Sequence, residues 1–215
     1  MIKMKKNIAT ILTVITLAIT LVGCKDKAKE ADTKEAEAAA VAKVASEKYI
    51  VDIASSIIEW KGFKPTGTHN GTISLDSGVF NLVDGTINSG TFLIDMKSIK
   101  DAEGSAKLEG HLKNADFFDV EQFSTAGFEV TGLEDADGKT ILSGNLTLKD
   151  VKNNVTFPVT VTNENGSVTI SSEAFTIDRT KWNVQYGSKS IFDNLGDKFI
   201  NDDIELKITV KATKS

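Results

Sequence analysis

The stretch VTFPVTV, residues 155–161, alternates apolar and polar side chains along most of its length. Its valines and phenylalanine fall on one face, and its threonines fall on the other. Because successive side chains of a β-strand point to opposite faces, this period of two predicts a strand with one buried and one wet face. Proline cannot donate to a neighbouring strand, so Pro158 predicts an edge or a bulge at that point.

The same alternation recurs in TFLIDM (91–96), SGNLTLKD (143–150) and IELKITVKA (204–212). Dipeptides typical of tight β-hairpin turns separate such runs. They are Asn70-Gly71, Asp84-Gly85, Asp137-Gly138 and Asn165-Gly166. About eight short strands at this spacing predict an all-β domain, either a sandwich or an antiparallel barrel, over residues 49–215.

Composition excludes several function classes. The 215 residues carry a formal charge of −5, whereas nucleic-acid binding needs a basic surface. The single cysteine, Cys24, excludes an internal disulfide framework. Two histidines and one cysteine provide little for a transition-metal site, so we expect neither a metal nor a cofactor.

Residues 1–24 have the features of a secretory signal. A start containing three lysines precedes an apolar run over residues 8–22, which is short for a membrane span, and Gly23 and Cys24 follow it. LVGC (21–24) resembles a bacterial lipobox, which implies a signal peptide over 1–23 and lipidation of Cys24. Such a protein would be held in the cell envelope by a lipid anchor, on the periplasmic or outer-membrane face. The alternative is an ordinary signal peptide with an incidental cysteine.

Residues 25–48 contain mainly alanine, lysine and glutamate, and no aromatic residue, proline or glycine. Such a segment cannot build a core. Together with Cys24 it is expected to form a tether over 24–48, either partly helical or simply a solvated spacer.

The stretch HLKNADFFDVEQF, residues 111–123, interrupts the strand pattern. Leu108, Leu112 and Ala115 follow a helical spacing, and Asp119 with Gln122 has the pattern of a cap for a second turn. We therefore expect a short helical insert near residues 104–123. Its phenylalanines would cover one end of a barrel, or only fill core beneath a long loop. A second irregular stretch, residues 178–203, is expected to line a cavity mouth or to wrap the barrel.

Four motifs occur in an order similar to that of the YceI-like, or polyisoprenoid-binding, family of bacterial envelope proteins. They are HLKNADFFDVEQF, FEV (128–130), LSGNLTLKDVKNNVTFPV (142–159) and FTIDRTKWNV (175–184). The resemblance implies a lipocalin-like barrel with an apolar cavity for a long amphiphilic chain, and no established catalysis. The chain departs from the family where Asp150-Val151-Lys152-Asn153 replaces a glycine-containing turn. True lipocalins carry G-x-W early in the chain, and Trp60-Lys61-Gly62 lacks that order.

The predicted function is therefore to bind an amphiphilic lipid, such as a polyisoprenoid, an isoprenoid quinone or a fatty-acyl chain, for carriage, storage or sensing. The predicted cavity lining is Ile58, Trp60, Phe92, Ile94, Met96, Phe118, Phe128, Leu146, Leu148, Phe157, Val159, Phe175, Ile177, Trp182, Leu206 and Ile208. A slip of one residue would turn any of these strands inside out.

The alternative is a solid barrel that acts through its outer surface as a structural or interaction lipoprotein. An enzyme is the least favoured class, because His69 and His111 are the only imidazoles and no nucleophile elbow or phosphate loop occurs. We expect Asp178 and Arg179 to form a structural ion pair. The expected partners are a lipid and the membrane, without nucleic acid, and a homodimer is left open.

Overall fold

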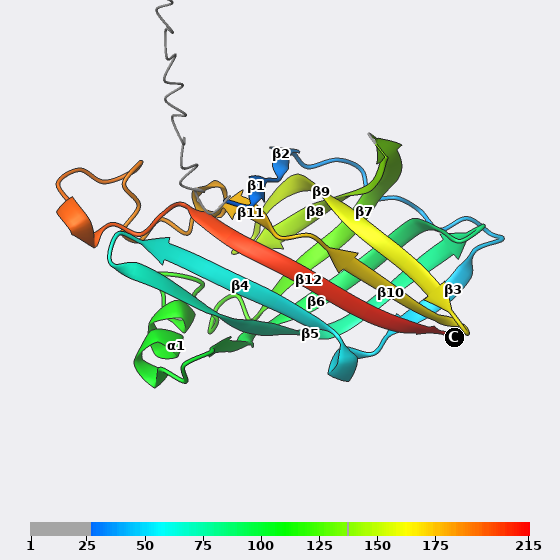
Figure 1. Cartoon of the computed structure of the whole chain (residues 1–215), viewed down its shortest axis with the longest axis horizontal. Helices are drawn as coiled ribbons and strands as arrows, with labels where there is room; N and C mark the ends of the chain where they lie inside the picture. Colours follow the sequence, from blue (N-terminus) through cyan, green and yellow to red (C-terminus); the bar gives the residue numbers. More distant parts are fainter. Residues whose placement is uncertain (1–26, 137) are drawn as a thin grey trace, which may run out of the picture.

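The computed structural model describes residues 27–136 and 138–215. The expected signal peptide, Cys24 and Asp137 lie outside the described residues. Within them, eight antiparallel strands close into a barrel (Figure 1), because β12 pairs with both β10 and β4. In ring order these are β4 (Ile57–Lys64), β5 (Gly67–Val83), β6 (Thr86–Asp101), β7 (Thr125–Ala136), β8 (Lys139–Leu148), β9 (Val151–Glu164), β10 (Ser167–Ser172) and β12 (Asp203–Lys214). The predicted antiparallel, lipocalin-like barrel is confirmed.

Shorter strands extend the ring at two places. β3 (Glu47–Val51) pairs with β5 and with the end of β12, and the 3₁₀ turn η1 (Ile53–Ser55) joins it to β4. β11 (Phe175–Asp178) follows β10 closely and pairs with the start of β12. The 3₁₀ turns η2 (Arg179–Trp182) and η3 (Gly196–Lys198) lie in the segment between β11 and β12.

The turn chemistry was predicted correctly at two hairpins. Asp84-Gly85 and Asn165-Gly166 have positive φ at both residues, as the two-residue turns β5–β6 and β9–β10 require. The β8–β9 turn uses Lys149-Asp150, with φ values of 47° and 60°. The resemblance placed this turn at residues 150–153, but residues 151–153 already belong to β9.

The prediction of a turn at Asn70-Gly71 was wrong. The β4–β5 hairpin turns at residues 65–66, and Asn70 and Gly71 lie within β5. A Cβ on Gly71 would sit 1.8 Å from the carbonyl oxygen of Lys100 on β6. Glycine is therefore present because two backbones approach closely, and not because the chain reverses.

Pro158 occupies the edge-like position that its chemistry predicted. On one side of β9, Pro158 pairs in register with Ile141 of β8. On the other side, β9 is paired through residues 153–156 with one strand and through residues 159–164 with β10, which leaves Pro158 between the two. The ladder on this second side is interrupted at Pro158, and such an interruption is where a residue without an N–H donor is tolerated in a sheet.

The predicted helical insert is confirmed as α1 (Ala106–Lys113) followed by turns to residue 123. Ser105 caps α1 by accepting from the Leu108 N–H. The Glu109 carboxylate accepts a hydrogen bond from the Asp101 N–H at 3.1 Å. This bond, and a second one from the Lys100 ammonium, lower the pKa of Glu109. The second turn closes when the Gln122 and Phe123 N–H groups donate to the Asp119 carbonyl, instead of by the expected side-chain cap.

Residues 29–46 form neither a helix nor a free spacer, and we call them the N-terminal belt. β1 (Lys29–Glu30) pairs in parallel with β11, and β2 (Asp32–Glu35) pairs with residues 153–156 of β9. Ala31, between them, is 6% exposed and belongs to the core. On this side, within the part of the chain that the structure describes, β11 and residues 153–156 of β9 pair with no strand other than β1 and β2, so the belt completes the wall between them. In Figure 1 the belt (blue) runs from β1 over the barrel to β3.

Backbone pairing explains why the expectation of a partly helical or solvated spacer was wrong. Farther along the belt, the Glu37 N–H donates to Asn145 Oδ1 and the Ala40 N–H donates to the Val130 carbonyl. Asn145 and Asn154 lie on the outer face of the barrel, yet each is 2% exposed. The free N–H and C=O groups at a strand edge can pair with the backbone of any sequence. A segment with few apolar residues can therefore still complete the wall of a barrel.

Candidate functional site

The barrel encloses an apolar cavity of about 330 Å³, a size at the lower end of ligand pockets in proteins. Of the sixteen residues predicted to line it, fifteen do so. They are Ile58, Trp60, Phe92, Ile94, Met96, Phe118, Phe128, Leu146, Leu148, Phe157, Val159, Phe175, Ile177, Leu206 and Ile208. That these side chains contact a ligand stays a prediction.

The placement of Trp182 in the cavity was wrong. This side chain is fully buried in η2, where it packs within the core cluster, and its indole Nε1 donates to the Leu146 carbonyl at 2.9 Å. Trp182 follows a strand end, so the alternation that placed the other residues does not apply to it. Trp182 is therefore part of the packed core around the cavity, with its indole N–H hydrogen-bonded.

A file of aromatic rings crosses the barrel interior and ends the cavity on one side. Tyr49, Phe80, Phe92 and Phe128 follow each other with centroid separations of 5.5, 6.1 and 6.3 Å, and Phe157 and Phe175 continue the file. The last four rings line the cavity, whereas Tyr49 and Phe80 do not. The Tyr49 and Phe80 end of this file therefore belongs to the packed core, and the other four rings form part of the cavity wall.

One glycine makes this file possible. A Cβ on Gly144 would lie 2.2 Å from Cζ of Phe128, so any other residue at this position would displace the ring. Phe128 could then no longer stand between Phe92 and Phe157.

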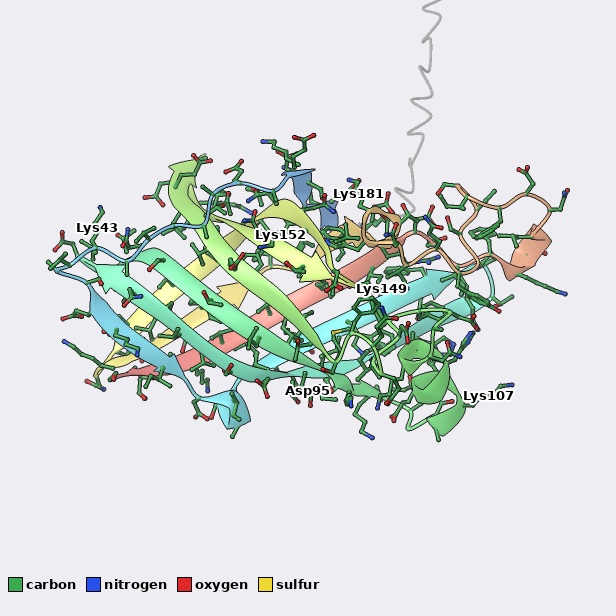
Figure 2. The ribbon with its side chains drawn as sticks, turned by 180° about the vertical axis from the view of Figure 1, so that it is seen from behind. Lys43, Asp95, Lys107, Lys149, Lys152 and Lys181 are labelled. Carbon is green, nitrogen blue, oxygen red and sulfur yellow. The ribbon has the colours of Figure 1, made fainter. Side chains whose placement is uncertain are left out.

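The other end of the cavity is covered by α1 and the turns after it, which we call the lid (residues 105–120). Leu108, Leu112, Phe117 and Phe118 of the lid line the cavity. The Lys149 ammonium donates to the Phe117 carbonyl at 2.9 Å and ties the lid to the β8–β9 turn. Figure 2 shows Lys149 where the lid meets the barrel wall, and Lys107 on the outer side of α1.

The lid meets the segment between β11 and β12 through three rings. His111 stacks edge-on against Phe117 and against Tyr186, each at 4.9 Å, and Phe117 lies 5.3 Å from Tyr186. His111 Nε2 also lies 3.1 Å from an Asp116 carboxylate oxygen. These contacts pack His111 into the lid, and its side chain also lines the cavity.

Polar side chains reach the cavity at this lid end, and sequence analysis identified them only in part. Lys64 and His69, from the two strands of the β4–β5 hairpin, line it with Asn201 and Asp203. Lys64 is exposed, so the cavity reaches the surface here, and we call this opening the mouth. Residues 178–203 thus line the mouth, one of the two roles expected for them. Strand alternation predicts which face a side chain occupies, but not where along the barrel a strand ends. The sequence therefore did not show that Lys64 and Asn201 line the mouth.

Arg179 holds the segment behind the mouth. Its guanidinium donates to the carbonyls of Val184, Ile200 and Asn201, and its side chain is 2% exposed. Its charged partner is Asp202 at 3.6 Å, not the predicted Asp178, which caps η2 instead. Burial lowers the pKa of Arg179, and the two carboxylates oppose that shift.

No cluster of His, Cys, Asp and Glu in 27–136 and 138–215 is arranged to hold a metal ion. In the same part of the chain, no helix is long and apolar enough to cross a membrane.

Solved structures with a similar fold include BcnA of Burkholderia cenocepacia, at a TM-score of 0.62 and 22% identity, covering 76% of this chain and 99% of that one. Another is described as a polyisoprenoid binding domain from Saccharophagus degradans implicated in plant cell wall breakdown. Its TM-score is 0.57 at 14% identity, and the match covers 78% of this chain and 98% of that one. At these identities the likeness shows the fold alone. No curated protein matches the chain.

The sequence model of the YceI-like domain matches residues 49–212, which are most of the chain and include all of the ring except the last two residues of β12. The belt precedes the matched residues. The chain belongs to the family of proteins with a YceI-like domain.

Proposed function

We propose that this protein binds one amphiphilic lipid, with the apolar chain in the barrel cavity and the polar head at the mouth. The observation that carries the proposal is the cavity itself, which is walled almost entirely by aliphatic and aromatic side chains and has its charged and imidazole side chains toward the mouth end. The polyisoprenoid binding domain of similar fold adds support for a long isoprenoid or acyl chain.

Burial of the chain would supply most of the affinity. Each buried methylene is worth about 0.8 kcal/mol, so ten of them contribute about 8 kcal/mol before the chain is ordered. Contacts of this kind do not distinguish one hydrocarbon from another. Selectivity would therefore come from Lys64 and His69, which line the mouth where a head group would lie.

We also propose that the lipid is carried or stored in the bacterial envelope by a protein anchored through Cys24. The basic and apolar leader that ends in LVGC supports this localisation. The absence of catalysis stays a prediction, and the lid contacts of His111 favour a structural role for that residue.

Native mass spectrometry of residues 25–215, purified without detergent, tests the lipid-binding function. This range keeps the belt, which contributes Ala31 to the core. We expect an adduct near one per chain, and extraction would identify its class. A bare protein mass that takes up neither an isoprenoid quinone nor a fatty amide would favour the alternative of a barrel that acts through its outer surface.

A matched pair of substitutions tests whether the hollow part of the barrel holds the lipid. Ala126 lines the cavity, whereas Ala212 is fully buried in the packed core cluster. Ala126→Phe should lower lipid retention at least tenfold with little change in stability, since the new ring occupies empty space. Ala212→Phe should cost about 1–3 kcal/mol through overpacking. Lipid uptake measures retention, and urea unfolding measures the stability of each variant. Equal destabilisation by the two changes would contradict a hollow interior.

A further inference from the structure

Apolar side chains are exposed beside the mouth. Residues 185–200, which we call the mouth loop, connect η2 to the segment before β12. Tyr186, Ile191 and Phe192 in this loop are 44%, 47% and 46% exposed. In Figure 1 this loop (orange) and α1 lie at the same end of the barrel, away from the C-terminus. Neighbouring exposed apolar side chains are a feature of protein and membrane contact surfaces, and these lie beside the mouth.

The mouth loop is held in place and presents these side chains in a fixed arrangement. The Ile200 N–H donates to the Gly187 carbonyl at 2.8 Å, and Arg179 donates to the Val184 and Ile200 carbonyls. The Ser190 hydroxyl donates to the Asp202 carboxylate at 2.6 Å. Because the loop is pinned at both ends and in the middle, the exposure of Ile191 and Phe192 is not the result of a free tail.

The charge of the mouth loop argues for an apolar partner. Its two lysines, Lys189 and Lys198, are balanced by Asp193 and Asp197. Lys189 also lies over the ring of Phe199, 5.0 Å from its centroid. A balanced loop attracts neither a polyanion nor an acidic membrane through its charge, so attraction must come from burial of the apolar side chains.

The start of the described chain identifies the partner. Lys27, the first described residue, forms an ion pair with Asp203, which lines the mouth. Lys181, at the same end in Figure 2, pairs with Glu30 of β1 at 3.5 Å. Cys24 precedes Lys27 by three positions, and three residues span at most about 11 Å. An acylated Cys24 in a bilayer would therefore hold the mouth within a short distance of the lipid head groups.

We propose that the mouth loop inserts Ile191 and Phe192 into the surface of a lipid bilayer and so sets the cavity mouth against the membrane. This inference rests on the proposed function for its purpose, because a lipid could then pass between bilayer and cavity without crossing open water. The partner is a phospholipid surface, and its recognition is apolar and insensitive to salt.

Brominated lipid tests the orientation, because bromine on an acyl chain quenches only nearby indole fluorescence. The full chain, as processed by its bacterial host, is reconstituted into phosphatidylcholine vesicles with and without bromine on the acyl chains. Phe192→Trp places an indole on the mouth loop. Ile53→Trp is the matched control, because Ile53 is 49% exposed in η1, at the other end of β4 from Lys64. Trp60 and Trp182 are common to both variants.

We expect brominated lipid to quench the added emission of Phe192→Trp at least twofold more than that of Ile53→Trp, equally at low and high salt. Equal quenching, stronger quenching of Ile53→Trp, or none in either variant would overturn the inference. Native mass spectrometry of the same preparations reports bound lipid separately. Bound lipid without selective quenching would contradict docking of the mouth loop on the membrane but not lipid binding in the cavity. Selective quenching of a protein that holds no lipid would contradict lipid binding but not the docking.

Discussion

Replacing Arg179 by methionine is expected to lower the free energy of unfolding by about 3–5 kcal/mol, because three buried carbonyls lose a charged donor at once. Arg179 is the only arginine in the chain, against 24 lysines, and it is among the least exposed side chains. Only a planar fork with five donors can serve Val184, Ile200 and Asn201 together. Urea unfolding monitored by far-ultraviolet circular dichroism measures the loss.

Two further variants distinguish the contribution of the planar guanidinium geometry from that of its positive charge. Arg179→Lys keeps the charge and should still lose most of the stability, because an ammonium cannot reach three carbonyls in one plane. Asp202→Asn should cost less, since Asp202 is partly exposed and lies 3.6 Å from the guanidinium. If Arg179→Lys were as stable as the parent, charge would matter more than geometry, and this account of the mouth segment would be wrong.

Gly71→Ala is the second large effect that we expect, at about 3 kcal/mol of lost stability. The added Cβ would meet the Lys100 carbonyl oxygen at 1.8 Å and Cζ2 of Trp60 at 2.9 Å. The Lys100 carbonyl also accepts the indole N–H of Trp60 at 3.2 Å. Relief of the clash must therefore move β5 from β6 or release Trp60 from the cavity wall.

Gly62→Ala is the control, because Gly62 lies on the adjacent strand β4 and a Cβ there would meet nothing within 4 Å. Gly62→Ala should raise the free energy of unfolding by no more than about 1 kcal/mol, because alanine lowers the conformational entropy of the unfolded chain. Thermal unfolding of the two variants side by side gives the comparison. Similar stabilities would show that the strands separate at no cost, which would contradict the close approach.

Strand alternation was enough to predict the barrel and most of its cavity wall. VTFPVTV places Val155, Phe157 and Val159 inward, and all three line the cavity. Period-two patterns work here because each strand has one face in the interior and one in water. Trp182 was misplaced because a 3₁₀ turn obeys no such period, and Asn70-Gly71 because glycine allows close approach as well as reversal.

Backbone interactions account for the features that sequence reasoning missed. The belt pairs through N–H and C=O groups that every residue carries, so lysine, glutamate and alanine gave no sign of it. Arg179 was expected to pair with its neighbour Asp178, but its main partners are carbonyls of residues 184, 200 and 201. Contacts between distant backbone segments leave no local pattern in a sequence.

The belt also constrains the order in which this chain can fold. Residues 29–35 emerge early during synthesis, but their partners at residues 153–156 and 175–176 come much later. Contacts between such distant positions form late and slow the folding of a domain. Residues 29–35 must therefore remain without these partners until the rest of the barrel has been made. Under the anchoring that we propose, they would be tethered to the membrane during that wait, and their final pairing would draw the finished barrel down to the bilayer.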